Sequence, residues 1–271
     1  MRRTIILLGL MGTIFASILF AQDKKHSLEI TWIGHSCFEI KYLNHRILID
    51  PFTPEWFDYA RPRGKYDFVF ASHKAKDHYF FEGIEADFYL LASGDREMFF
   101  QKSRSGNQLL EGRTAKNYGK GTFTFWTVPS YHDDQKGALE GVNGILCFDF
   151  DGIKVVHLGD LGHVLEEDHI KKIGAVDVLM IPIDGYFTIN IDTAKKIINQ
   201  LDPKIVFPMH YKTERSKQTQ PIYTEKDILD GFSNIKGLHR SRLVIDENIL
   251  NQKRTIILLE YLEKTEKRKK G

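Results

Sequence analysis

Cysteine is scarce in this chain of 271 residues, which contains only Cys37 and Cys147. This count excludes a metal site built from cysteine alone. Each cysteine lies in a short apolar run typical of a β-strand, so we expect two buried free thiols that pack as small hydrophobic side chains. A disulfide between them is the alternative if the protein is exported.

Net charge is also small, because 38 Lys and Arg residues face 36 Asp and Glu residues for a formal charge of +2. Proteins that bind nucleic acids normally carry a basic excess to neutralise phosphates, so we expect no nucleic-acid partner. An apolar fraction of 42% excludes a mainly disordered chain.

One long apolar run is present, at the N-terminus. Arg2 and Arg3 precede the almost uncharged residues 4–20, and Ala21 precedes a polar stretch. This pattern predicts a signal peptide over residues 1–21 of an exported protein, periplasmic or secreted, with no stable membrane span after cleavage. The run is also long enough to cross a bilayer as an uncleaved N-terminal anchor, and this alternative stays open.

The remainder shows no internal repeat or linker, which predicts one domain over residues 22–261 and a basic tail over 262–271. Short β runs come first and helices later, as in an α+β fold of two packed sheets covered by helices. Nothing in the pattern indicates an oligomeric state. The predicted strands are 28–33, 37–42, 46–50, 67–71, 122–128, 145–150, 154–158, 176–181, 205–209, 242–245 and 255–259, and the predicted helices are 192–201 and 224–232.

Several predicted strands end directly in a side chain that can bind a metal ion. His73 follows one apolar run and continues to Asp77 and His78, Asp160 closes a second, and His210 closes a third. A weaker case is His132, after residues 127–131. Strand ends that share one edge place these groups in one cleft, and imidazole with carboxylate suits Zn²⁺ and the activation of water.

In this order the segments resemble the metallo-β-lactamase-fold hydrolases, and the resemblance is closest to the branch related to ascorbate-6-phosphate lactonase. The resemblance implies a four-layer αββα sandwich and a hydrolase whose metal-activated water attacks a small-molecule lactone, amide or phosphoester. The matching segments are 33–38, 48–51, 72–78, 129–133, 157–163, 181–188 and 208–211.

The family holds two metal ions, bridged by an aspartate and a hydroxide. Carried onto this chain, the resemblance assigns the first ion to His73, His132 and Asp160. It assigns the second ion to Asp77, His78, Asp160 and His210. Asp77 and His210 are the predicted catalytic residues, with Asp77 as a proton acceptor beside the nucleophile.

The chain departs from the family pattern His-x-His-x-Asp-His at Ala75, where the pattern has its second histidine. A methyl group cannot bind a metal, so the first ion loses one imidazole. We therefore expect one firmly bound Zn²⁺, with a second ion held weakly or not at all. Mn²⁺ and Fe²⁺ are also compatible with these ligands. The alternative is a non-catalytic protein that keeps the fold for binding or sensing.

Five further residues are weaker candidates near the site. His35 and Asp50 are expected to orient metal ligands through hydrogen bonds, or to serve as structural turn residues. His163 and Tyr186 are expected to line the cleft as substrate contacts, or to be structural. Asp184 stands where relatives usually carry glycine. It could replace the missing ligand, repel an anionic substrate, or face solvent.

Overall fold

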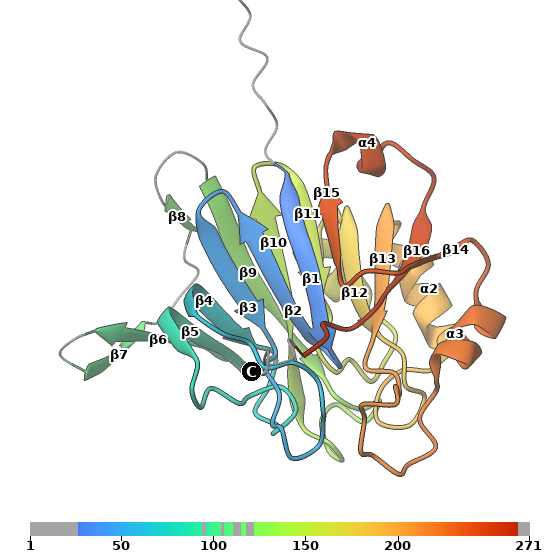
Figure 1. The fold of residues 1–271 in the computed structure, drawn as a ribbon, viewed down its shortest axis with the longest axis horizontal. Coiled ribbons are helices and arrows are strands. Elements are labelled where there is room, and N and C mark those ends of the chain that lie inside the picture. Colours follow the sequence, from blue (N-terminus) through green and yellow to red (C-terminus); the bar gives the residue numbers. More distant parts are fainter. Residues whose placement is uncertain (1–26, 94–95, 104–105, 111–114, 118–121, 265–271) are drawn as a thin grey trace, which may run out of the picture.

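The computed structural model describes residues 27–93, 96–103, 106–110, 115–117 and 122–264 (Figure 1). Two mixed sheets of eight strands each face one another. The first sheet has the order β15-β1-β2-β3-β4-β5-β6-β7, with β15 Arg242–Ile245, β1 Leu28–Gly34, β2 Cys37–Tyr42, β3 His45–Ile49, β4 Lys65–Ala71, β5 Glu85–Ser93, β6 Arg96–Ser103 and β7 Gly106–Leu110. The second has the order β14-β16-β13-β12-β11-β10-β9-β8, with β14 Ile235–Leu238, β16 Thr255–Leu259, β13 Ile205–Met209, β12 Val178–Pro182, β11 Ile153–His157, β10 Val142–Phe150, β9 Thr122–Tyr131 and β8 Ala115–Asn117.

The main core lies between the two sheets, because side chains alternate along each strand. In β1, Leu28, Ile30 and Trp32 all point into this core, while Ile33 belongs to a cluster on the opposite face. Aromatic rings from both sheets fill the centre, where Phe70 of β4 meets Phe148 of β10 at 5.0 Å between ring centroids. The α+β two-sheet sandwich predicted from the sequence is confirmed.

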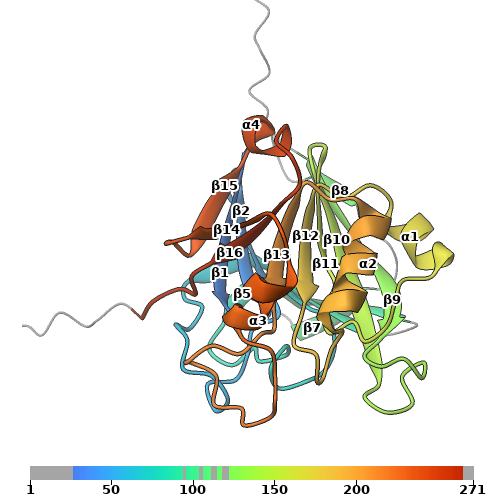
Figure 2. The same cartoon turned by 90° about the vertical axis from the view of Figure 1, so that its right-hand side faces the viewer.

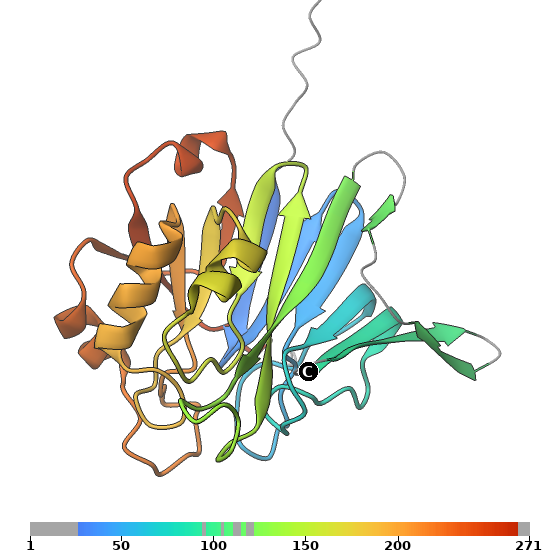
Figure 3. The same ribbon diagram turned by 180° about the vertical axis from the view of Figure 1, so that it is seen from behind.

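Helices cover the outer face of the second sheet. Its central strands β11, β12 and β13 run parallel and are buried on both faces, as parallel strands normally are. Figures 2 and 3 show α1 (Glu167–Ile173) and α2 (Ile191–Leu201) lying across this face. Helix α2 begins at Asn190, whose side chain accepts a hydrogen bond from the Thr193 amide, and it ends before Pro203. Two further helices, α3 (Glu225–Gly231) and α4 (Glu247–Leu250), follow later in the chain.

A loop covers part of the outer face of the first sheet, where the four-layer sandwich implied by the resemblance has helices. Its apolar cluster takes Phe52, Phe57 and Tyr59 from the irregular segment that follows β3. These three rings pack on one another at 5.4 to 5.7 Å between centroids. Among the described residues, this aromatic loop therefore covers the outer face of the first sheet, as helices α1 and α2 cover the outer face of the second sheet.

Most predicted elements are present, within a few residues of their expected bounds. A hairpin turn at Asp151 and Gly152, with φ of 52° and 94°, joins β10 to β11 between two of the predicted strands. Elements not predicted include β5, β14 and α1. Both cysteines are buried free thiols, as expected.

The two predicted terminal segments fall wholly or largely outside the described residues. The predicted signal segment 1–21 lies outside them, and only residues 262–264 of the predicted tail lie inside. None of the helices in the described ranges is both long enough and apolar enough to span a bilayer.

Gly144 generates a prediction about the contact between the sheets beside the site. Its amide donates to the Ser72 carbonyl at 2.9 Å, and an added Cβ would lie 2.2 Å from the Cβ of Ala92. Gly144→Ala should therefore lower the free energy of unfolding by about 1–3 kcal/mol, the usual effect of overpacking, in urea unfolding. Gly237→Ala in β14 is the control, because its Cβ would meet no atom within 4 Å. Equal stability of the two variants would contradict this account of the sheet contact.

Candidate metal centre

The loops after β1, β4, β9, β11 and β13 lie at the lower edge of the sheets in Figure 1. These loops bring seven buried side chains together. They form two groups, within each of which one potential ligand atom per residue lies within 4.8 Å of the others. The sequence predicted six of the seven as metal ligands, and it placed His35 behind the ligands. The first group is His73, His132 and Asp160, and the second is His35, Asp77, His78 and His210.

Asp160 joins the two groups. Its Oδ2 lies 3.0 Å from Nε2 of both His78 and His132, 3.3 Å from His210 Nε2 and 3.7 Å from His73 Nε2. Its side chain is 2% exposed. One carboxylate oxygen therefore faces four imidazoles from three separate loops, which is the bridging position that the family resemblance implies.

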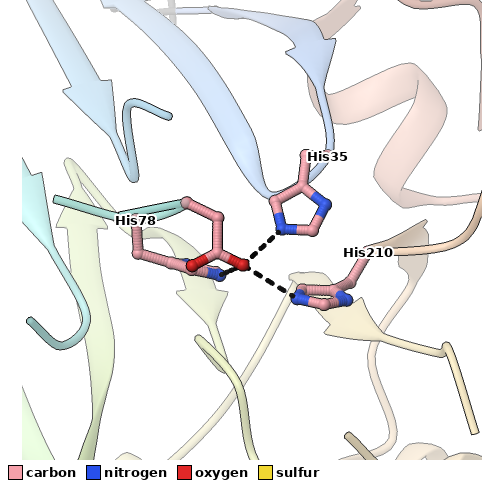
Figure 4. A group of neighbouring side chains, drawn as sticks. His35, His78 and His210 are labelled. Carbon is pink, nitrogen blue, oxygen red and sulfur yellow. Dashed lines mark ion pairs between the residues drawn. The ribbon is translucent and has the colours of Figure 1, made fainter. Parts of the chain in front are cut away.

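Asp77 forms the centre of the second group, where it faces three histidines. Figure 4 shows these histidines, His35, His78 and His210, gathered around one point. Its Oδ2 lies 3.3 Å from His35 Nε2 and 3.9 Å from Nε2 of both His78 and His210. His35 has a φ of 53°, and its carbonyl accepts hydrogen bonds from Trp32 Nε1 and the His210 amide. The turn between β1 and β2 thus fixes His35 with its ring directed at Asp77.

Behind these groups, Asp50 orients two of the imidazoles. Its Oδ2 lies 2.7 Å from His78 Nδ1 and accepts a hydrogen bond from the Ser72 hydroxyl. Its Oδ1 accepts a hydrogen bond from the Ser72 amide. The same hydroxyl lies 3.0 Å from His73 Nδ1. Carboxylates that hold the outer nitrogen of a ligand histidine fix its orientation and leave Nε2 directed at the metal.

Asp184 forms an ion pair with His210, in which Oδ2 lies 2.7 Å from His210 Nδ1. Its Oδ1 accepts hydrogen bonds from the amides of Tyr186, Phe187 and Thr188. The residue is 0% exposed, so the expectation that it faces solvent is wrong. It lies on the outer side of His210 and belongs to neither group of potential ligands, so the structure does not place it where the missing ligand would be.

The ionisation of the site follows from this crowding of acids and imidazoles. Burial lowers the pKa of both His35 and His73 to about 4, which keeps these rings neutral. Burial also lowers the pKa of His210, but Asp160 and Asp184 outweigh it and raise that pKa to about 10. The same balance raises the pKa of His78 well above its usual range, through Asp160, Asp50 and Asp77. Against the effect of burial, Asp160 also raises the pKa of His132. Without an ion, protonated histidines therefore supply the positive charge that these carboxylates favour.

The donor set fits a metal ion because its inward atoms lack other partners. Within the described part of the chain, Nε2 of His35, His73, His78 and His210 and Oδ1 of Asp160 are buried with no hydrogen-bond partner. Buried polar atoms are normally paired, and neutral imidazole with carboxylate is a preferred ligand set for Zn²⁺. The second group with Asp160 supplies a full set of ligands. The first group has only two imidazoles.

A cleft of about 530 Å³ opens onto both groups. Ala75 lies in its wall, where the family pattern has an imidazole. The predicted contacts His163 and Tyr186 are not among its lining residues: His163 Nε2 accepts the Tyr131 amide, and Tyr186 is 55% exposed. The lining residues are Trp56, His73, Lys74, Ala75, Asp77, His132, Glu140, Asp160, Phe187, His210, Lys217, Gln218, Thr219 and Gln220.

Asp133 has no role predicted from the sequence. Its carboxylate stabilises the conformation of the loop after His132. It accepts four backbone amides, from Gln135, Gly137, Leu139 and Glu140, at 2.8 to 3.0 Å. Burial alone would raise its pKa, but these donors lower it to about 2. Gly137 lies in this loop with a φ of 79°. A glycine at this point in the sequence is a turn signal that could have indicated such a loop.

Asp184 provides a test of how the second group is oriented. In Asp184→Asn the amide oxygen can still accept the loop amides, but the amide nitrogen would face His210 Nδ1 and favour the tautomer that carries a proton on Nε2. We expect Zn²⁺ affinity to fall about 10–100-fold, measured by competition with a chelator, with little change in urea unfolding. Asp184→Ala should lose both metal affinity and stability. Wild-type affinity in the asparagine variant would contradict the orienting role.

Comparison with known proteins agrees with this geometry. Residues 29–210 match the Beta-lactamase superfamily domain. A UPF0173 metal-dependent hydrolase of Archaeoglobus fulgidus is 27% identical over 198 residues, which cover 69% of this chain and 84% of the relative. One from Nanoarchaeum equitans is 29% identical over 194 residues, covering 69% and 85%.

Two solved structures are similar throughout the fold. A protein from Thermotoga maritima, described as a Zn-dependent hydrolase of the metallo-β-lactamase superfamily, aligns with a TM-score of 0.63 and 27% identity, over 86% of this chain and 99% of that one. A protein of Parabacteroides distasonis has a TM-score of 0.57 at 19% identity, over 87% and 94%, and supports the fold alone. The chain belongs to the β-lactamase superfamily, as a metal-dependent hydrolase of the metallo-β-lactamase fold.

Proposed function

We propose that this protein is a zinc-dependent hydrolase that directs a water molecule at the carbonyl or phosphoryl centre of a small lactone, amide or phosphoester. The observation that carries the proposal is the set of buried Nε2 atoms that converge on the carboxylate of Asp160 at the floor of an open cleft. A cleft of this volume suits a small molecule.

A bound Zn²⁺ would supply a water of lowered pKa and positive charge opposite the oxyanion that forms after attack. The residues of the second group would hold it, together with the bridging carboxylate. Asp77 lies in the cleft wall, where its carboxylate can accept the proton of the attacking water. His210, fixed by Asp184 and Asp160, presents Nε2 to the same region.

We further propose that one ion is held firmly and that the first group is weak. His73 and His132 are its only imidazoles, and Ala75 provides no third. The full ligand set of the second group supports occupancy there. Mn²⁺ or Fe²⁺ would fit the same histidines and carboxylates.

Restoring the missing imidazole tests this stoichiometry. After exhaustive dialysis against metal-free buffer, the wild-type protein should retain one equivalent of zinc and Ala75→His should retain two, as measured by elemental analysis. Ala75→Ser is the matched control, because it adds a polar atom without an imidazole. Two equivalents in the wild-type protein would overturn the proposal of a weak first group.

Hydrolysis itself is tested with a panel of lactones, amides and phosphodiesters. Activity toward at least one class should depend on added Zn²⁺ and should fall by about 10³-fold or more in His210→Ala, because the ion and its orientation are lost together. His163→Ala is the control from outside both groups. Activity that survives in His210→Ala would contradict the assignment.

A second candidate is a binding or sensing protein that keeps the fold without catalysis. The observation that favours it is Ala75, which removes an imidazole from the first group. This candidate predicts zinc retention in the second group with no metal-dependent turnover of any member of the panel.

We also propose that the protein is exported and acts on a small molecule, with no nucleic-acid partner. The N-terminal pattern at Arg2, Arg3 and residues 4–20 supports export, with an N-terminal anchor as the alternative. The near balance of acidic and basic residues argues against a nucleic-acid partner.

A further inference from the structure

Lys74 occupies an unusual place in the cleft wall, between His73 of the first group and Ala75. It is exposed, and no carboxylate among the described residues lies within ion-pair distance of it. It is therefore a free ammonium group on the wall that leads to the metal ligands.

Lys76, two residues further along the chain, and Lys217, which also lines the cleft, both have polar partners. Lys76 pairs with Glu55, with Nζ at 3.5 Å from Oε2. Lys217 also lines the cleft, but its Nζ donates to the carbonyls of Pro54 and Glu55 at 3.1 and 3.2 Å. Lys74 thus differs from both in having its positive charge available to a ligand.

The backbone around Lys74 is held in place, so that its side chain starts from a fixed point. The Ala75 carbonyl accepts hydrogen bonds from the amides of His78 and Tyr79 at 3.1 and 2.7 Å. The Lys76 carbonyl accepts the Thr53 amide at 2.9 Å. A preorganised loop loses little entropy when a ligand binds.

Most of the negative charge in the cleft lining is already compensated. Of the three acidic residues in the lining, Asp77 and Asp160 face histidines, and only Glu140 is an exposed carboxylate. The methyl group of Ala75, which occupies less volume than an imidazole, also lines this cleft. The aromatic rings of Trp56 and Phe187 line the same cleft.

We propose that Lys74 and the space beside Ala75 form an anion subsite, so that the substrate carries a carboxylate or phosphate group next to the bond that is hydrolysed. This inference rests on the proposed function and deepens it. The residue change that weakens the first metal group thereby opens a place for a charged substrate group. The ammonium binds this group by a charge-assisted hydrogen bond.

Anion binding to the zinc-loaded full chain tests the subsite without turnover. Inorganic phosphate and acetate are titrated separately by calorimetry, so that the two arms distinguish phosphate from carboxylate recognition. Lys74→Gln should weaken the preferred anion about tenfold, and Lys74→Arg should retain most of the affinity. Lys76→Gln, two residues away and outside the cleft lining, should bind as the wild-type protein does. Equal effects of Lys74→Gln and Lys76→Gln, or no anion binding, would overturn the inference.

Hydrolysis then separates this inference from the proposed function. Matched neutral and anionic lactones are compared, and the anionic compound should have the lower KM, an advantage that Lys74→Gln removes with little change in kcat. Turnover with no charge preference would sink the anion subsite and leave the hydrolase intact. Anion binding that depends on Lys74, with no turnover of any compound, would refute the hydrolase and leave the subsite.

Discussion

The structure depends on one buried carboxylate, that of Asp160. Its Oδ2 lies within 3.0 to 3.7 Å of four imidazole nitrogens, and it has almost no contact with solvent. A buried charge needs compensation, and protons on His78 and His210 or a divalent cation can provide it. The arrangement around Asp160 therefore favours a bound cation at this point and makes the site a metal centre rather than a conventional core.

The fold supports this centre by placing strand ends from both sheets at one edge and backing them with further carboxylates. Asp50 holds His78 and Asp184 holds His210, each at 2.7 Å from the outer nitrogen. Each of these carboxylates also accepts backbone amides, so that the loops and the ligands are fixed by the same groups. Rigid strands and shared acceptors together provide the precision that metal ligands need.

The sequence predicted much of the fold and most of the centre, because both are encoded locally. Alternating apolar residues gave the strands, and His73, Asp77 and His78 stand together in one short motif. What remained hidden depends on pairing between distant segments. No local pattern shows that Asp184 faces His210, and propensity did not reveal β14 or the aromatic loop that covers the first sheet.

The central claim is that a metal ion binds between Asp160 and the second group. Crystals of the zinc-loaded protein, measured at the zinc absorption edge, test it most directly by anomalous scattering. The account predicts one strong peak at about 2.0–2.2 Å from Asp160 Oδ2, His78 Nε2 and His210 Nε2, with a weak or absent peak near His73 and His132. A dominant peak at His73 and His132, or no peak near Asp160, would contradict it.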